Sequence, residues 1–228
     1  MTEWPGLDQA ALDADGVAVI RGLLDPADCA EAAGWFDQPA RFRKQVVMQS
    51  HGYGRGEYRY FGYPLPERVA ALRAGLYPAL AAIANRWAAV LGQDARFPPD
   101  HAAYLARCHS AGQTRPTPLL LRYGPGDYNR LHQDVYGAEL FPLQLVVLLS
   151  APGRDFSGGA FVLTEQRARM QSRVEVVGLE QGDAAVFAVR DRPVLGARGV
   201  SRAVMRHGVS RVISGGRMTL GVIFHDAA

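Results

Sequence analysis

The sequence predicts an α+β fold, in which a mostly helical N-terminal part supports an antiparallel β-core. Residues 1–112 show mainly helical periodicity, whereas residues 113–228 consist of short apolar runs separated by Gly, Pro and Asp. The chain has 228 residues, of which 48% are hydrophobic and 21% are charged. A chain of this length and composition can bury one sizeable core. We therefore expect a single domain, residues 1–228.

Three segments of the first part carry helix signals. An Asp-Pro pair at 25–26 combines an N-cap acceptor with a proline at the first helical position, and it opens a helix expected to reach residue 36. Apolar residues within 66–91 recur at steps of three and four, which is the helical period. Pro78 is expected to bend or break that helix. A third helix is expected over residues 100–109.

Eight short apolar runs in the second part are predicted to be strands. So many strands in about 110 residues are typical of a sandwich, a jelly roll or a barrel. The predicted strands are residues 119–123, 131–135, 144–150, 160–164, 174–177, 184–189, 203–209 and 218–224.

Composition argues against several classes of protein. Cys29 and Cys108 stand far apart without a CxxC pattern, which argues against a disulfide scaffold or a structural zinc site and fits a reducing compartment. Residues 1–16 contain four acids and no apolar core, so we expect no signal peptide. No apolar run approaches the roughly 18 residues that span a bilayer. We expect a cytoplasmic protein without a membrane partner, and the oligomeric state is not predicted.

Positive charge is concentrated late in the chain. The net charge is +3, and Lys44 is the only lysine. Between residues 190 and 217 there are seven arginines and one acid, Asp191. Arginine-rich strands beside a pocket attract anionic partners, but the same arginines also fit the solvated outer faces of strands.

Three side chains of the metal-ligand type stand out in the predicted β-core. His132 and Asp134 are separated by one residue, and His207 follows 73 residues later. On a strand, residues i and i+2 point to one face about 6–7 Å apart, so both can reach one ion. Two histidines and one carboxylate form the ligand set of non-haem Fe(II) oxygenases. Taken alone, a His-x-Asp pair is common, and a single histidine on a β-face is usually a core residue.

Arg217 and Thr219 strengthen the metal-site hypothesis. We expect residues 206–224 to form a hairpin: with a three-residue turn, His207, Arg217 and Thr219 all point inward, whereas a two-residue turn would put His207 and Arg217 on opposite faces. A buried guanidinium needs an anion, and a carboxylate held by two hydrogen bonds meets that need. The pattern therefore predicts a carboxylate co-substrate beside the metal.

The stretch from Leu119 to the C-terminus resembles the Fe(II)/2-oxoglutarate dioxygenase superfamily. YGPGDY at 123–128, which leads to HQD at 132–134, resembles the prolyl-4-hydroxylase branch, as does SGGAF at 157–161. In that branch a tyrosine nine residues before the first ligand contacts the distal carboxylate of the co-substrate. The resemblance assigns this role to Tyr123, and Arg217 stands where that branch has its basic residue.

A closer resemblance, over nearly the whole chain, is to a bacterial family labelled as oxygenases that act on damaged DNA by oxidative demethylation. In the DNA-dealkylating branch a second arginine follows six residues after the co-substrate arginine, and here that position is Ile223. The motifs that carry the closer resemblance are HGYGRGEYRYFGYPLP (51–66), IANRW (83–87), AGQTRPTPLLL (111–121), GGAFVLTEQRARMQSR (158–173), RHGVSRV (206–212) and LGVIFHD (220–226).

The resemblance implies a double-stranded β-helix, or jelly-roll, core with a helical N-terminal support layer. It also implies that Fe(II) binds to three side chains and that 2-oxoglutarate binds to the iron and to three others. With O2, the co-substrate becomes succinate and CO2 while a substrate is hydroxylated, or demethylated through a hydroxymethyl intermediate; ascorbate is a further cofactor of such enzymes. The implied iron ligands are His132, Asp134 and His207, and the implied co-substrate residues are Arg217, Thr219 and Tyr123.

The primary substrate is left open between a nucleic acid, a protein or peptide, and a small molecule. Residues 41–63 interleave basic and aromatic side chains, which can stack on single-stranded nucleic acid, form an edge hairpin that covers the pocket and binds a peptide, or simply pack on the helices. Glycines at 52, 54 and 56 suit a mobile lid. Glu165 and Gln166 are candidates for the pocket border. The competing class of function is a jelly-roll domain that binds a metal or ligand without turnover.

Overall fold

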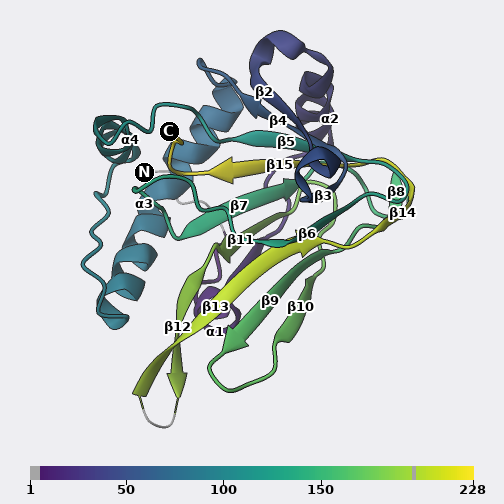
Figure 1. Ribbon diagram of the computed structural model, residues 1–228. Helices are drawn as coiled ribbons and strands as arrows, with labels where there is room; N and C mark the ends of the chain where they lie inside the picture. Colours follow the sequence, from purple (N-terminus) through teal and green to yellow (C-terminus); the bar gives the residue numbers. More distant parts are fainter. Residues whose placement is uncertain (1–5, 197–198) are drawn as a thin grey trace.

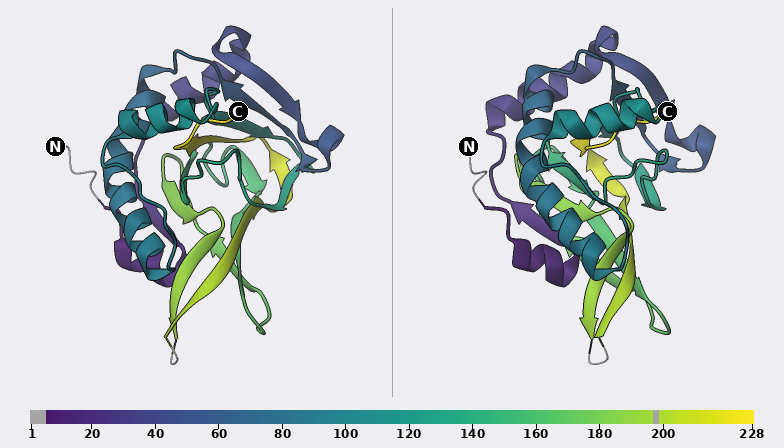
Figure 2. Two further views of the ribbon diagram at one scale, coloured as in Figure 1. Left: turned by 60° about the vertical axis from the view of Figure 1, so that its left-hand side comes forward. Right: turned by 90° about the vertical axis from the view of Figure 1, so that its left-hand side faces the viewer.

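The structure is a computed structural model that describes residues 6–196 and 199–228. Glu3 of the acidic N-terminal segment and Arg198 of the arginine-rich stretch lie outside the described residues. Two β-sheets form the centre of the molecule, and the helices gather on one side of them (Figure 1, Figure 2). The predicted α+β class, with an antiparallel jelly-roll core, is confirmed.

The helices come from the N-terminal part of the chain, as predicted. Asp25 and Asp100 cap two of them by accepting hydrogen bonds from the backbone N–H groups of Asp28 and Ala103. Three short 3₁₀ helices follow the second α-helix, over residues 35–37, 39–41 and 48–51. The α-helices are α1 (Gln9–Asp15), α2 (Pro26–Gly34), α3 (Glu67–Val90) and α4 (His101–Ser110).

Pro78 does not break α3, contrary to one of the two predicted effects. The helix is continuous from Glu67 to Val90. A proline leaves the carbonyl four residues earlier, here that of Ala74, without its helical hydrogen bond. Ala74 and Pro78 both lie on the exposed face of α3, so water can solvate that carbonyl.

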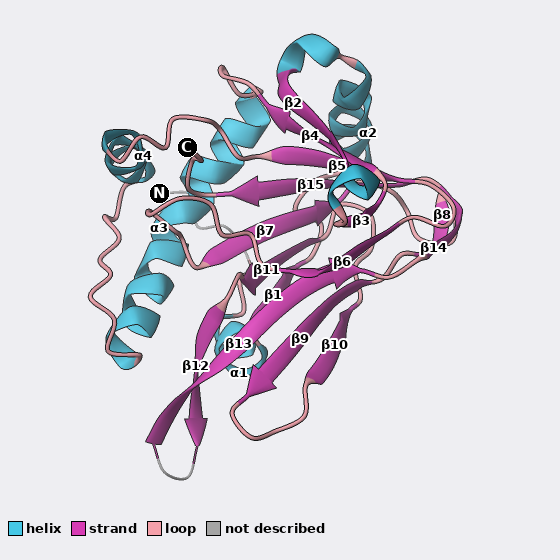
Figure 3. Ribbon diagram, in the orientation of Figure 1, coloured by secondary structure: helices cyan, strands magenta, loops and turns pink. Residues whose placement is uncertain are grey.

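The larger sheet has seven strands and joins both parts of the chain. Its strand order is β1-β11-β7-β15-β5-β4-β2, so that the N-terminal part supplies strands at both edges (Figure 3). Helices α2 and α3 contact β15. The strands are β1 (Val17–Ile20), β2 (Phe42–Val47), β4 (Glu57–Phe61), β5 (Leu119–Tyr123), β7 (Leu143–Leu148), β11 (Ala184–Ala188) and β15 (Arg217–Ile223).

The second sheet has the order β10-β9-β13-β6-β3, and β12 pairs with β13. A separate pair, β8 and β14, lies where the chain passes between the sheets. The strands are β3 (Gly54–Arg55), β6 (Tyr128–His132), β8 (Phe156–Gly158), β9 (Phe161–Arg167), β10 (Arg173–Val177), β12 (Asp191–Gly196), β13 (Gly199–Val209) and β14 (Val212–Gly215).

Two strand predictions need correction. The strand predicted at 131–135 is β6, which ends at His132, so Asp134 lies in the segment after it. The predicted hairpin over 206–224 does not form, because β13 and β15 belong to different sheets and β14, between them, pairs with β8. Strand β1 of the first part, and β8, β12 and β14 of the second, were not predicted; β2 to β4 lie in residues 41–63, for which an edge hairpin was one of three alternatives.

Among the described residues, no helix combines the length and the apolar character that a membrane crossing requires. Cys29 and Cys108 are both buried free thiols.

Candidate functional site

Three side chains meet where β6 and β13 pair. His132, the last residue of β6, lies opposite His207 of β13, and their ring centroids are 4.2 Å apart. Asp134 turns back toward both rings: its Oδ1 lies 3.5 Å from Nε2 of His132, and its Oδ2 lies 3.3 Å from Nε2 of His207. One ligand-type atom from each residue lies within 4.8 Å of the other two. The structure thus brings the three predicted ligands together, although Asp134 is not on the strand.

The protonation of this cluster suits a divalent cation. Burial opposes ionisation of Asp134, but hydrogen bonds from His132 and His207 outweigh it and hold the pKa of Asp134 well below its usual value. Burial lowers the pKa of His207, and the charge of His132 acts in the same direction. Burial also disfavours the charged form of His132, but the hydrogen bond to Asp134 prevails and raises its pKa. A carboxylate and a neutral imidazole are therefore already present.

The orientation of His132 is set by the backbone. Its Nδ1 lies 2.7 Å from the carbonyl oxygen of Arg130. A carbonyl can only accept, so Nδ1 carries a proton and Nε2 is the nitrogen that faces the cluster. A metal ion that displaces the Nε2 proton would bind there, as in metal-bound histidines.

Two tyrosines are attached to the cluster: Tyr136, which the sequence analysis missed, and Tyr60, which it included only among the aromatic residues of 41–63. The hydroxyl of Tyr136 donates to Oδ1 of Asp134 at 2.8 Å, and the hydroxyl of Tyr60 donates to that of Tyr136 at 3.2 Å. The only local signal was the two-residue spacing of Tyr136 from Asp134. Tyr60 lies 76 residues away from Tyr136 in the sequence, so no local pattern predicts their hydrogen bond.

The predicted co-substrate residues lie on the facing sheet. Arg217 of β15 pairs across strands with Tyr123 of β5, and its guanidinium lies 5.5 Å from the centre of that ring. Thr219, two residues along β15, points to the same face, and Arg217 and Thr219 are each 2% exposed. Burial lowers the pKa of Arg217 to about 10. His207 and Arg217 therefore do face inward together, but from opposite sheets and not from one hairpin.

Several buried polar atoms around Arg217 and His207 lack hydrogen-bond partners within the described residues. Nε and Nη1 of Arg217 and the hydroxyl of Tyr123 are buried without a hydrogen-bond partner in the described part of the chain, and Nδ1 of His207 is in the same state. Such atoms are costly to bury alone. Their concentration around one space indicates that a polar ligand belongs there.

One cavity of about 570 Å³ joins these residues. Both the metal cluster and the Arg217 group line it, together with Phe161 and Phe187. Residues 41–63 supply the 3₁₀ helix 48–51 and strands β2 to β4, so the edge hairpin that was one of three alternatives for this segment is present. Its members on the cavity wall are Arg43, Lys44, Val46, His51, Gly52, Tyr53, Tyr58 and Tyr60.

Several other polar residues lie away from the cavity, in ion pairs or in the core. Glu165 is buried and paired with Arg192 and Arg167, and neither Glu165 nor Gln166 lines the cavity. His101 and His225 are buried in the core. Of the described arginines between 190 and 217, Arg192 and Arg217 are buried and the others lie on the surface or partly exposed, so Arg217 alone among them lines the cavity.

Sequence comparison identifies relatives over most of the chain. The model of the family Oxygenase-NA, described as an oxygenase that catalyses oxidative methylation of damaged DNA, matches residues 56–227. Two uncharacterized proteins from two strains of Mycobacterium tuberculosis are 51% identical to this chain over 196 residues, which cover 84% of this chain and 84% of each relative.

Solved structures show the same fold at low identity. A 2OG-Fe(II) oxygenase family oxidoreductase from Burkholderia pseudomallei is 18% identical, with a TM-score of 0.53 over 96% of this chain and 90% of that one. A prolyl-4-hydroxylase from Pseudomonas putida is 15% identical, with a TM-score of 0.50 over 93% of each chain. A prolyl hydroxylase from Trichoplax adhaerens, solved in complex with a peptide fragment, is 13% identical, with a TM-score of 0.51 over 93% of this chain and 84% of that one.

Proposed function

The chain belongs to the Oxygenase-NA family, and from that premise we propose that it is an Fe(II)- and 2-oxoglutarate-dependent oxygenase in which His132, Asp134 and His207 bind the metal. We further propose that it forms one domain, because strands from residues 1–112 complete the sheets of residues 113–228. Three ligands leave other coordination positions of the ion open for co-substrate and O2.

The observation that carries the proposal is the unsatisfied Arg217. The guanidinium of Arg217 is costly to bury without an anion, because the residue is 2% exposed and two of its nitrogens have no hydrogen-bond partner. The distal carboxylate of 2-oxoglutarate is such an anion. It would lie against Arg217, with the hydroxyls of Thr219 and Tyr123 as additional donors.

Each residue of the proposed site has a separate role. Iron, when bound, supplies the activation of O2, for which the oxidation of 2-oxoglutarate to succinate and CO2 provides electrons. Arg217 sets the position of the co-substrate through its fixed charge. Phe161 and Phe187, which line the same cavity, exclude water from the reacting centre. The carbonyl of Arg130 keeps His132 in the tautomer whose Nε2 can bind metal.

For the primary substrate, the family description names damaged DNA, and this is the first candidate. The position of the second arginine of DNA-dealkylating relatives is occupied by Ile223, which packs with Tyr60 and Leu119. A peptide is the second candidate, because strands β2 and β4 form the edge hairpin beside the cavity.

The proposal is tested by succinate release from 2-oxoglutarate with Fe(II) and O2, together with metal binding. Asp134→Ala should abolish turnover and weaken Co(II) binding, measured by visible absorption. Asp94→Ala makes the same chemical change at an exposed position outside the cavity and should alter neither. Equal succinate release from Asp134→Ala would refute the ligand set. Mass spectrometry for the gain of one oxygen or the loss of one methylene then compares methylated oligonucleotides with peptides.

A further inference from the structure

The charged side chains on the cavity wall are mostly cationic. Among the lining side chains, Asp134 is the only carboxylate, whereas five are cationic: Arg43, Lys44, Arg115, Arg130 and Arg217. Within the described residues, none of the five takes part in an ion pair, although more than half of the chain's arginines do. The proposed partner of Arg217 is the distal carboxylate of the co-substrate. Four cations remain without an assigned partner.

Strand register places Lys44 at the end of the cavity opposite to Arg217. Lys44 pairs with Tyr60, Tyr60 pairs with Leu119, and Leu119 pairs with Gly221, so these residues form one row across the larger sheet. Arg217 lies four residues along β15 from Gly221. At about 3.3–3.4 Å per residue, the row of Lys44 lies roughly 13 Å from the row of Arg217.

The metal cluster is connected to the row of Lys44. The hydroxyl of Tyr136 bridges Asp134 and Tyr60, with hydrogen bonds of 2.8 and 3.2 Å. A co-substrate anchored at Arg217 therefore approaches the metal from one side, and the cationic end opens on the other side. That second side is where a primary substrate must lie.

Arg43 is held rigidly at this end. Its Nε donates to the carbonyl oxygen of Pro116 at 2.8 Å, and its guanidinium lies 4.7 Å from the centre of the Tyr60 ring. These contacts leave its two terminal nitrogens available. Burial lowers the pKa of Arg43; the charge of Arg115 acts in the same direction, whereas Tyr60 and Asp226 oppose it. Guanidinium groups on one cavity wall repel each other, and an anion bound between them removes the repulsion.

We propose that the cavity has a second oxyanion site, formed by Arg43, Arg115 and Lys44, which binds a phosphate or carboxylate group of the primary substrate. The remainder of the substrate would lie along Tyr58, Tyr60 and Tyr136, between that site and the metal. A planar ring or an extended backbone fits against such a tyrosine wall. This inference rests on the proposed function only for its assignment of Arg217 to 2-oxoglutarate.

Lys44 provides a direct reporter, because it is the only lysine of the chain. The full-length protein is saturated with Mn(II) and 2-oxoglutarate, so that Arg217 is occupied. It is then acetylated with an amine-selective ester at low ionic strength, and acetylation of Lys44 is followed by peptide mass spectrometry. Pyrophosphate, a short single-stranded oligonucleotide and an acidic peptide serve as competing anions.

We expect at least one of these anions to slow the acetylation of Lys44 in a saturable and salt-sensitive way. The concentration for half-protection should rise about tenfold in Arg115→Gln and in Arg43→Gln, as for the loss of one charge-assisted hydrogen bond. Arg169→Gln removes the same charge from the exposed turn between β9 and β10, at the bottom of Figure 1 and far from β2, and should leave protection unchanged.

No protection by any anion, or protection that survives both cavity substitutions, would overturn the second site. Arg115 is exposed, so Arg115→Gln keeps the test valid if Arg43→Gln does not fold. The strongest competitor identifies the source of the oxyanion, whether pyrophosphate-like, nucleic acid or peptide. Succinate release is measured separately, so a protein without turnover can still show protection, and an active enzyme can lack it.

Discussion

The hydroxyl of Tyr136 donates a 2.8 Å hydrogen bond to Oδ1 of Asp134, the one carboxylate of the metal cluster. Oδ2 of the same carboxylate is left facing His207. Tyr136 therefore restricts the rotation of Asp134, and in the proposed metal site Oδ2 would be the oxygen left for the ion. Tyr60 in turn fixes the hydroxyl of Tyr136.

Tyr136→Phe should weaken metal binding by about tenfold or more, because outer partners of metal ligands typically contribute that much. We expect kcat to fall while the KM for 2-oxoglutarate changes little, since Arg217 is untouched. Co(II) titration followed by visible absorption measures the affinity and the ligand geometry. Tyr60→Phe is the matched control, since it leaves the bond to Asp134 intact, and its effect should be smaller. Unchanged Co(II) affinity in Tyr136→Phe would show that the contact has no positioning role.

Arg217→Gln should raise the KM for 2-oxoglutarate by one to two orders of magnitude. Hydrogen bonds to charged groups contribute roughly 1.5–3 kcal/mol each, and 1.4 kcal/mol is about tenfold in affinity. Arg217→Lys keeps the charge but loses the paired donors, so it should recover part of the affinity. Initial rates of succinate release at varied 2-oxoglutarate give both values. Equal KM values in Arg217→Gln and in the unaltered enzyme would place the co-substrate elsewhere.

The convergence of His132, Asp134 and His207 could be predicted because the first two stand two residues apart and all three lie in β-rich sequence. The position of Arg217 could be predicted only in part. A local hairpin rule placed His207 and Arg217 on one face, whereas β13 and β15 lie in facing sheets. The cause is β14, which pairs with β8 across a sequence separation that no local pattern reveals; the Ser157 and Ser214 hydroxyls in that pair are 57 residues apart and 2.6 Å from each other.

β1 was missed, and the hairpin of β2 and β4 was only one of three alternatives, for a related reason. β1 has four residues and is stabilised by its pairing with β11, some 165 residues later in the chain. β4 adds Tyr58 and Tyr60 to the cavity only because it pairs with β5. Aromatic and basic side chains in 41–63 indicated a binding segment, but their positions depend on these long-range contacts.

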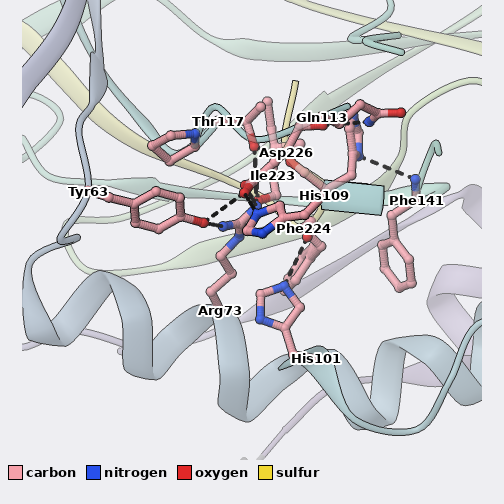
Figure 4. A network of polar contacts seen from close by, with 12 residues as sticks. Tyr63, Arg73, His101, His109, Gln113, Thr117, Phe141, Ile223, Phe224 and Asp226 are labelled. Carbon is pink, nitrogen blue, oxygen red and sulfur yellow. Dashed lines mark hydrogen bonds and ion pairs between the residues drawn. The ribbon is translucent and has the colours of Figure 1, made fainter. Parts of the chain in front are cut away.

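A buried ion pair ties the end of the chain to α3. Nη2 of Arg73 lies 2.7 Å from Oδ1 of Asp226, and both side chains are almost fully buried. Tyr63 and His109 reach Oδ2 of the same carboxylate at 2.8 and 2.9 Å (Figure 4). The network therefore leaves Asp226 with three partners and no solvent.

Arg73→Met should lower the free energy of unfolding by about 3–5 kcal/mol, because it leaves a buried carboxylate without its cation. Urea denaturation measures this change. Arg86→Gln removes one partner of an exposed ion pair with Asp13 and should cost about 1 kcal/mol or less. Similar losses for the two variants would mean that Asp226 finds solvent or another partner when Arg73 is absent.

Two buried histidines should make the protein sensitive to mild acid. Burial lowers the pKa of His101 and of His225 to about 4, whereas an unperturbed histidine has a pKa near 6.5. Nε2 of His101 lies 2.9 Å from the carbonyl oxygen of Phe224, and Nδ1 of His225 accepts from the backbone N–H of Phe141. The latter bond requires an unprotonated Nδ1.

Stability falls with decreasing pH wherever the unfolded chain binds more protons than the folded protein. Below about pH 6.5 the unfolded chain protonates both histidines while the folded protein does not, so stability is full above that pH and falls until about pH 4. Each histidine contributes a loss of up to about 3 kcal/mol over that interval. Urea denaturation between pH 7.5 and 4.5 checks this. His101→Asn should flatten the profile, whereas His51→Asn, at an exposed position, should not. A pH-independent free energy over that range would contradict the buried neutral state of both rings.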